Sequence, residues 1–305
     1  MEKNEKIYVA GHTGFIGSAI MRKLEVQGYH NVITRTHAEL DLTNQKQAAE
    51  FFDKERPNYV FNAAGRVGGR YANDTYRGEF LYENVMIATN VIHFSHINEV
   101  KRLMFVGAAS IYPRQSLKLM REENILTGAL DPTEEPASIA NITGLKLCES
   151  YNQQYGDDFL AVIPTCLYGP RQHYDPLNSL VVPALIYKFH LANIERREKV
   201  IVWGTGRAQR DFLYVDDFAD SMIFLMRDYL GSDVLNIGSG ETLSIIEAAS
   251  LIKELVGFEG EVILDDSKPD GVLIKMPDLS KLRKLGWTPK VKFREGIQKT
   301  YEADL

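Results

Sequence analysis

The stretch KIYVAGHTGFIGSAI, residues 6–20, decides the fold. Its short aliphatic run leads directly into Gly11, Gly14 and Gly17, and apolar residues at helical spacing follow. The first glycine permits a tight turn, the second lets a pyrophosphate approach the backbone, and the third allows helix and strand to pack closely. The start of the helix adds amide donors for phosphate. The stretch therefore predicts a dinucleotide-binding turn between a first strand and a first helix.

Further aliphatic runs with little polar alternation follow along the chain, separated by segments of helical period. This alternation is typical of parallel strands joined by crossover helices, and it predicts an α/β fold with a doubly wound, parallel Rossmann sheet. The predicted strands are Ile7 to Ala10, Val32 to Thr34, Tyr59 to Ala63, Leu103 to Val106, Leu160 to Ile163 and Val234 to Ile237.

The pattern changes from about Gly169, where prolines and glycines interrupt the periodic segments. We therefore predict a Rossmann domain over residues 1–168 and a smaller C-terminal lobe over residues 169–305. One strand of the second part, at about 234–238, is expected to return to the first sheet.

Composition narrows the class of protein. The 305 residues are 45% hydrophobic and 25% charged, which suits one or two globular domains. A net charge of −6 offers no broad cationic field for nucleic acid or an anionic membrane. The two cysteines, Cys148 and Cys166, have no metal-site spacing, so no metal is predicted. With no apolar run of membrane-spanning length and a charged start, the sequence predicts a cytoplasmic protein without a membrane partner.

The end of the second predicted strand bears on the choice of cofactor. A carboxylate usually stands there in NAD-binding proteins and bonds the ribose hydroxyls, but this chain reads Thr34, Arg35, Thr36 and His37. Arg35 offers a cation for the 2′-phosphate of NADP, although an arginine on a loop is often only a solvated charge. NADP is therefore favoured over NAD, and Asp41 is a predicted neighbour of the adenine.

Several longer motifs, spread over nearly the whole chain, resemble GDP-L-fucose synthase, an extended short-chain dehydrogenase. They are NAAGRVGGRYAN (62–73), YENVMIATNVIHFS (82–95), IYP (111–113), GLKLCESYNQQYG (144–156), PTCLYGP (164–170), WGTGRAQRDFLYVDD (203–217) and KPDG (268–271). The resemblance implies a homodimer that epimerises GDP-4-keto-6-deoxymannose at C3 and C5 and then reduces C4 with NADPH. The implied partner is thus a GDP-linked sugar, and the C-terminal lobe is implied to bind it.

The resemblance also assigns binding positions. For NADP these are Gly11, Thr13, Gly14, Phe15, Ile16, Gly17, Ala63, Ala64, Pro164 and Leu167. For the sugar nucleotide they are Lys188, Trp203, Arg210 and Asp270. Lys188 stands where the family has a diphosphate-binding arginine, and a lysine there loses bidentate geometry. Outside this motif context, Trp203 would read as a core residue and Arg210 as a surface ion-pair partner.

The catalytic positions break the resemblance. The family reduces its ketone with a tyrosine that donates a proton and a lysine four residues later that lowers the tyrosine's pKa. In the corresponding stretch, EPASIANITG, Ala137 occupies the tyrosine position and Asn141 the lysine position. Alanine has no ionisable proton, and asparagine carries no charge. The neighbouring Ser138 is not expected to replace them, because its neutral hydroxyl has no supporting lysine.

Three more functional positions are substituted. Ala108 replaces the expected serine, Ser110 the epimerisation cysteine and Leu180 the expected histidine. His173, in a nearby loop, is a weak candidate for a base, and Tyr112 is more readily explained by packing. Joint loss of five groups indicates altered or abandoned chemistry, since one acid–base group commonly contributes about 10²- to 10⁴-fold in rate.

Three interpretations follow. The chain is a nucleotide-sugar enzyme of the fucose-synthase type with an altered mechanism, or a non-catalytic subunit or regulator that binds cofactor or sugar nucleotide. The third is an ordinary NADPH-dependent epimerase and reductase whose proton donor comes from another part of the chain. The expected cofactor is NADP, with NAD in its place or loss of cofactor binding as the alternatives.

Overall fold

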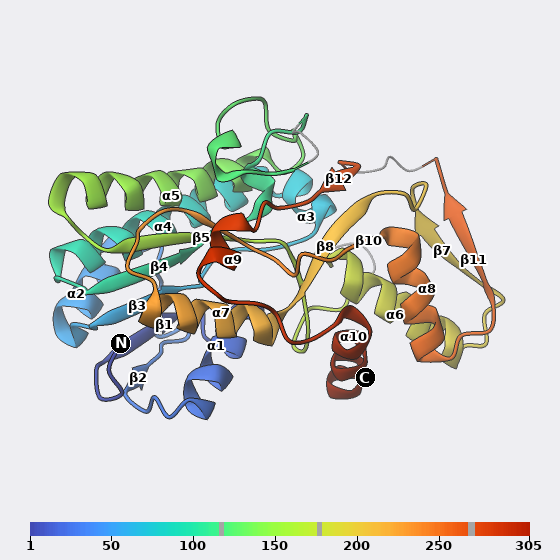
Figure 1. The fold of residues 1–305 in the computed structure, drawn as a ribbon, viewed down its shortest axis with the longest axis horizontal. Coiled ribbons are helices and arrows are strands. Elements are labelled where there is room, and N and C mark those ends of the chain that lie inside the picture. Colours follow the sequence, from blue (N-terminus) through green and yellow to red (C-terminus); the bar gives the residue numbers. More distant parts are fainter. Residues whose placement is uncertain (116–118, 176–178, 268–271) are drawn as a thin grey trace.

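A central six-stranded sheet organises the protein, with the strand order β2-β1-β3-β4-β5-β9 and parallel pairing throughout (Figure 1). The computed structural model describes residues 1–115, 119–175, 179–267 and 272–305. The strands of this sheet are β1 (Ile7–Ala10), β2 (Val32–Ile33), β3 (Tyr59–Asn62), β4 (Arg102–Val106), β5 (Phe159–Pro164) and β9 (Leu235–Ile237).

These six strands are the six predicted from the aliphatic runs, and the α/β Rossmann fold class is confirmed. Their ends differ from the prediction by a residue: β2 stops at Ile33 and β3 stops at Asn62. Differences of this size are ordinary at the ends of secondary-structure elements.

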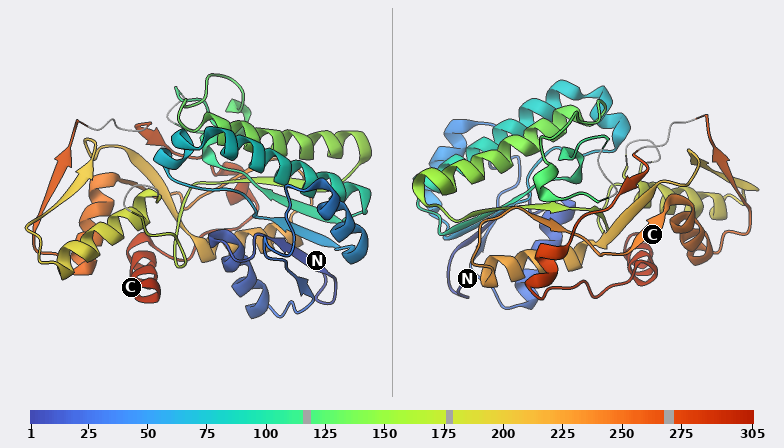
Figure 2. Two further views of the ribbon diagram at one scale, coloured as in Figure 1. Left: turned by 180° about the vertical axis from the view of Figure 1, so that it is seen from behind. Right: turned by 45° about the horizontal axis from the view of Figure 1, so that its top comes forward.

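Helices cover both faces of the sheet (Figures 1 and 2). Successive side chains of β1 point to opposite faces, so Ile7 and Val9 enter one core and Tyr8 and Ala10 the other. The first core is closed by α1 (Phe15–Val26) and α7 (Val215–Asp228). The second is closed by α2 (Gln45–Glu55), α4 (Arg77–Ile97) and α5 (Glu135–Tyr155).

A smaller sheet lies beside the first and is built around β8 (Gln209–Tyr214) (Figure 1). β8 pairs in parallel with β6 (Cys166–Tyr168) and β12 (Ile274–Lys275) and antiparallel with β10 (Thr242–Ser244). A separate parallel pair is formed by β7 (Lys199–Trp203) and β11 (Glu261–Asp265). The helices of this part are α6 (Val181–Ile194), α8 (Ile245–Val256) and α10 (Phe293–Asp304).

The remaining elements are short. They are α3 (Arg70–Thr75), α9 (Ser280–Lys284) and the 3-10 turns η1 (Ala109–Ile111) and η2 (Glu122–Asn124). Throughout the described ranges, the helices fall short of the length and apolar character needed to cross a membrane. The same residues contain no group of three or more acidic, histidine or cysteine side chains arranged to hold a metal ion.

The chain passes between the two sheets through very short connections. β5 ends at Pro164 and β6 begins at Cys166, so Thr165 alone joins them. β8 ends at Tyr214 and α7 begins at the next residue, Val215. Because β6 pairs with β8, the chain enters the smaller sheet just before Gly169, and β9 returns to pair with β5. The division into domains at residue 168 stays a prediction.

The contact between α5 and β4 leads to a stability prediction. A Cβ atom on Gly144 of α5 would lie 2.4 Å from the ring of Phe105, which is 5% exposed. Gly144→Ala is therefore expected to lower the free energy of unfolding by about 1–3 kcal/mol through overpacking. Gly78→Ala, in α4, is the matched control because nothing lies within 4 Å of its Cβ position. It is expected to be neutral or to stabilise by up to about 1 kcal/mol. Urea unfolding measures both, and equal effects would contradict the packing explanation.

Candidate functional site

The glycine turn at the end of β1 permits a very close approach of α1 to the strand. Gly11 has φ +77°, a conformation that favours glycine, and its carbonyl accepts from the Gly14 N–H at 2.9 Å. A Cβ on Gly17 would lie 2.0 Å from the Gly11 carbonyl oxygen. Gly11 in turn packs on the segment after β3, where its Cβ would lie 2.7 Å from the Ala63 oxygen. The first and third glycines are thus required by geometry.

Unsatisfied polar atoms beside this turn fit a bound dinucleotide. Asn62, at the end of β3 and opposite Ala10, is 1% exposed, and its amide oxygen and nitrogen have no hydrogen-bond partner in the described ranges. The same is true of the buried Nδ1 of His12 within the turn. Buried polar groups are normally hydrogen-bonded, so these atoms indicate a polar ligand at the carboxyl ends of β1 and β3. The sheet order reverses between these two strands, where α/β proteins bind their ligands.

The predicted cofactor residues are distributed around this crevice. Thr13, Gly14, Phe15 and Ile16 form the turn and the first residues of α1, and Ala63 and Ala64 follow β3. Pro164 ends β5, and Leu167 lies in β6 with its side chain buried in the first core. Any contribution from Leu167 would therefore come from its backbone.

Arg35 and Asp41 are engaged with the protein itself. The Arg35 guanidinium donates to Glu55 of α2 at 2.7 Å and to the Thr34 carbonyl at 2.7 Å. Asp41 accepts from the backbone and hydroxyl of Thr43, and the hydroxyl bond chiefly holds the pKa of Asp41 below its usual value. A role for Arg35 at a 2′-phosphate would thus require it to share or release Glu55.

Two of the positions predicted to be substituted, Ala137 and Asn141, lie near the start of α5. Glu134 is the N-cap, and Ala137 and Asn141 follow at spacings of three and four residues on the same helix face. The Asn141 side-chain amide donates to the Ala137 carbonyl at 2.9 Å. Ser138 is fully buried and donates to the carbonyls of Glu134 and Ser110. The Ser138 hydroxyl therefore links α5 to η1 by a hydrogen bond.

Tyr112 follows Ala108 and Ser110 in the sequence, and its environment does not suit a role as an acid or a base. It is 4% exposed, and its hydroxyl donates to the Asn236 side chain on β9 at 2.7 Å. Burial raises the pKa of Tyr112 far above its usual value. The phenol is thus a packed structural group.

Two further predicted positions, Leu180 and His173, lie at the N-cap of α6 and in the loop before it. Leu180 is its N-cap and is 39% exposed. His173 lies in the preceding loop with an exposed side chain, and its carbonyl accepts from the Ser179 hydroxyl. No contact in the described ranges joins the His173 ring to the α5 positions.

The sugar-nucleotide positions form a second group. The Lys188 ammonium of α6 lies 4.9 Å from the centre of the Trp203 ring on β7, and burial lowers the pKa of this lysine. Trp203 is 46% exposed, so it is not a core residue. Arg210 lies on β8, where it is paired in register with Lys275 of β12. Asp270 lies outside the described residues.

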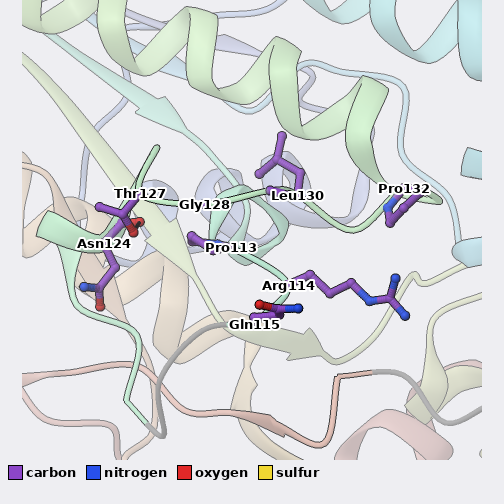
Figure 3. Close-up of a pocket in the computed structure, with 9 residues that line it drawn as sticks. Pro113, Arg114, Gln115, Asn124, Thr127, Gly128, Leu130 and Pro132 are labelled. Carbon is purple, nitrogen blue, oxygen red and sulfur yellow. Dashed lines mark hydrogen bonds between the residues drawn. The ribbon is translucent and has the colours of Figure 1, made fainter.

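Sequence reasoning missed an ion pair between these two groups. Lys275 donates to Glu134 Oε2 at 3.2 Å, joining β12 to the start of α5. Both residues line a cavity of about 10 Å³ together with Ser110 and Tyr112. A larger cavity of about 400 Å³ adjoins it and shares Pro113 and Arg114 (Figure 3). In the sequence, each residue of this ion pair could have been noticed only because it lies close to a predicted site motif. Glu134 precedes Ala137 by three residues, and Lys275 follows the KPDG motif (268–271) by four.

Comparison with known proteins identifies the family. The family model described as the NAD dependent epimerase/dehydratase family matches residues 7–238. The chain belongs to this family. GDP-L-fucose synthase 1 of Arabidopsis thaliana is 49% identical over 301 residues, covering 99% of this chain and 93% of that protein. GDP-L-fucose synthase of Escherichia coli (strain K12) is 42% identical over 309 residues, covering 98% and 96%. The predicted resemblance is confirmed.

Solved structures give the same result for this epimerase/dehydratase family member. MlghC, a GDP-mannoheptose C4 reductase from Campylobacter jejuni with NADP bound, is 38% identical with a TM-score of 0.92, and the match covers 99% of both chains. The comparison therefore extends over both sheets.

The tight turn of this epimerase/dehydratase family member gives a second prediction. Gly17→Ala forces α1 away from Gly11 and is expected to lower NADPH affinity about tenfold or more, equal to ~1.4 kcal/mol. Fluorescence titration with NADPH measures the affinity, and the Gly78→Ala variant is the control. Equal affinity in the two variants would show that the turn tolerates a side chain.

Proposed function

We propose that this protein binds NADP and a GDP-linked deoxyhexose in the manner of GDP-L-fucose synthase, without reducing the sugar ketone at an ordinary enzymatic rate. The observation that carries the proposal is the pair Ala137 and Asn141 at the start of α5, within an otherwise family-like chain. NADP binding is supported by the glycine turn, the unpartnered atoms of Asn62 and the NADP in the related MlghC structure. Binding of a GDP-sugar is supported by the names of the relatives and by the Lys188–Trp203 contact.

NADPH, when bound, supplies a hydride, and the protein must then protonate the alkoxide that forms. Ala137 offers no proton, and the Asn141 amide is directed to the helix backbone. Tyr112 donates to Asn236, and Lys275 donates to Glu134. Without a placed donor, the reduction loses the contribution of general acid catalysis, about 10²- to 10⁴-fold.

The alternative functions differ in what the retained binding positions do. A non-catalytic subunit or regulator would use ligand binding alone. An active reductase with a relocated donor would need a phenol or another acid over the cofactor, and the engagement of Tyr112 and Lys275 speaks against that pair. The homodimer and the cytoplasmic location stay predictions from the resemblance and the sequence.

Loss of reduction is tested by offering the protein GDP-4-keto-6-deoxymannose and NADPH. We expect no NADPH oxidation above background at 340 nm. The variant carrying Ala137→Tyr, Asn141→Lys and Ala108→Ser together is expected to gain activity by about 10²-fold or more, because it restores the donor, its charge and the second hydroxyl. Turnover by the unmodified protein at the rate of an ordinary reductase would overturn the proposal.

Ligand binding is tested separately by thermal unfolding. A ligand that binds only the folded state stabilises it, by about 2.7 kcal/mol at a concentration of 100 times Kd. We expect GDP to raise the melting temperature, and Lys188→Met to reduce that rise by removing the ammonium beside Trp203. Lys146→Met, on the exposed part of α5, is the control because Lys146 pairs only with Glu149 in the described ranges. No shift with millimolar GDP would contradict the binding claim.

A further inference from the structure

The ion pair between Glu134 and Lys275 stands where the two groups of site residues meet. Glu134 shares a helix face with the substituted positions Ala137 and Asn141. Lys275 lies beside Arg210 in the smaller sheet. The pair therefore joins the start of α5 to the strand that lies beside Arg210.

Both charged groups are accessible from the site. Their side chains are 23% and 19% exposed, and in the described ranges Glu134 Oε1 accepts no hydrogen bond. The small cavity that they line has room for about one water-sized group, and it adjoins the larger cavity at Pro113 and Arg114. A ligand atom that reaches this cavity meets a carboxylate and an ammonium at once.

The nearby thiol supports this placement. Cys166 lies at the start of β6, which pairs with β8. Burial raises the pKa of the Cys166 thiol, while the charges of Arg210 and Lys275 act in the opposite direction. The effect of both cations on this thiol agrees with the register pairing of Arg210 and Lys275 on neighbouring strands.

Besides the ion pair, the polar groups that line the cavity are Asp131, Tyr112, Ser110 and the cation Arg114. Asp131 accepts from Thr133 and from Arg70 at 2.7 Å, and although burial opposes it, the Thr133 bonds lower the pKa of Asp131. Tyr112 donates to Asn236. Ser110 is a neutral alcohol. Among the described residues that line the cavity, Glu134 is the carboxylate with an oxygen left for a ligand.

We propose that Glu134 is a general base that removes the proton from the carbon next to the keto group of a 4-keto sugar nucleotide, with the Lys275 ammonium facing the carbonyl oxygen. The inference rests on the proposed function, because that function supplies the keto sugar. A carboxylate base and a cation at the oxygen are the groups that such enolisation requires.

The step is redox-neutral and balanced. The C–H bond breaks and its proton forms an O–H bond with Glu134, while its electron pair becomes the C=C bond of an enolate and the carbonyl pair moves onto oxygen. The proton on Glu134 exchanges with water and then returns to carbon, which restores the ketone. Nothing is oxidised or reduced, so the step needs neither the missing tyrosine nor a hydride.

The test measures deuterium entry into GDP-4-keto-6-deoxymannose in D₂O without NADPH. Mass spectrometry and NMR report deuterium at C3 and C5, and heat-denatured protein gives the background. We expect exchange by the unmodified protein and a loss of about 10²- to 10⁴-fold in Glu134→Gln, which keeps the shape of the side chain and loses the base. Lys275→Met is expected to slow exchange as well, by about 10²-fold.

Glu135→Gln is the matched control. Glu135 is the next residue, its side chain is 49% exposed, and it lies 3.6 Å from Arg77 instead of in the cavity. It is expected to exchange at the unmodified rate. Melting temperatures and the GDP-induced shift show whether each variant is folded and binds.

The outcomes separate the two proposals. Exchange that is lost in Glu134→Gln and kept in Glu135→Gln supports Glu134 as the base. If GDP stabilises the unmodified protein and no deuterium enters, or if Glu134→Gln exchanges as fast as the unmodified protein, the base assignment is overturned while the binding function stands. Absence of any GDP-induced shift overturns the proposed function and this inference together.

Discussion

The structure depends on the contact between α1 and β1 at the glycine turn. With Gly17 packed directly on the Gly11 carbonyl, the start of α1 lies close against the end of β1. A side chain at Gly17 would push α1 away from the turn, and one at Gly11 would displace the segment after β3, because Ala63 packs against Gly11. One steric constraint therefore sets the helix, the crevice and the neighbouring strand end together.

Much of this arrangement was predictable because it depends on local patterns. Six buried strands stood out as aliphatic runs, and the glycine turn is specific when strand and helix flank it. What the sequence did not predict is which distant side chains meet. We expected Arg35 to bind the 2′-phosphate of NADP. In the structure, its guanidinium donates a hydrogen bond to Glu55, which lies twenty residues away in the sequence. The local sequence around Arg35 contains no information about that choice.

The Glu134–Lys275 pair shows the same limit more clearly. The two residues are 141 positions apart, and they meet where β12, paired with β8, reaches the start of α5. Neither residue belongs to the catalytic motif that sequence comparison examines. Two charged groups can thus meet beside Ala137 although a motif read along the chain would not bring them together.

The short passages between the sheets limit how the protein can move. With one residue between β5 and β6, and none between β8 and α7, the two parts have no slack with which to separate. Rigid connections of this kind allow at most a small rotation about the line that joins them, in contrast to the wide hinge closure of proteins with long interdomain segments. A separation of the two parts would therefore have to disturb the β5–β6 or the β8–α7 connection itself.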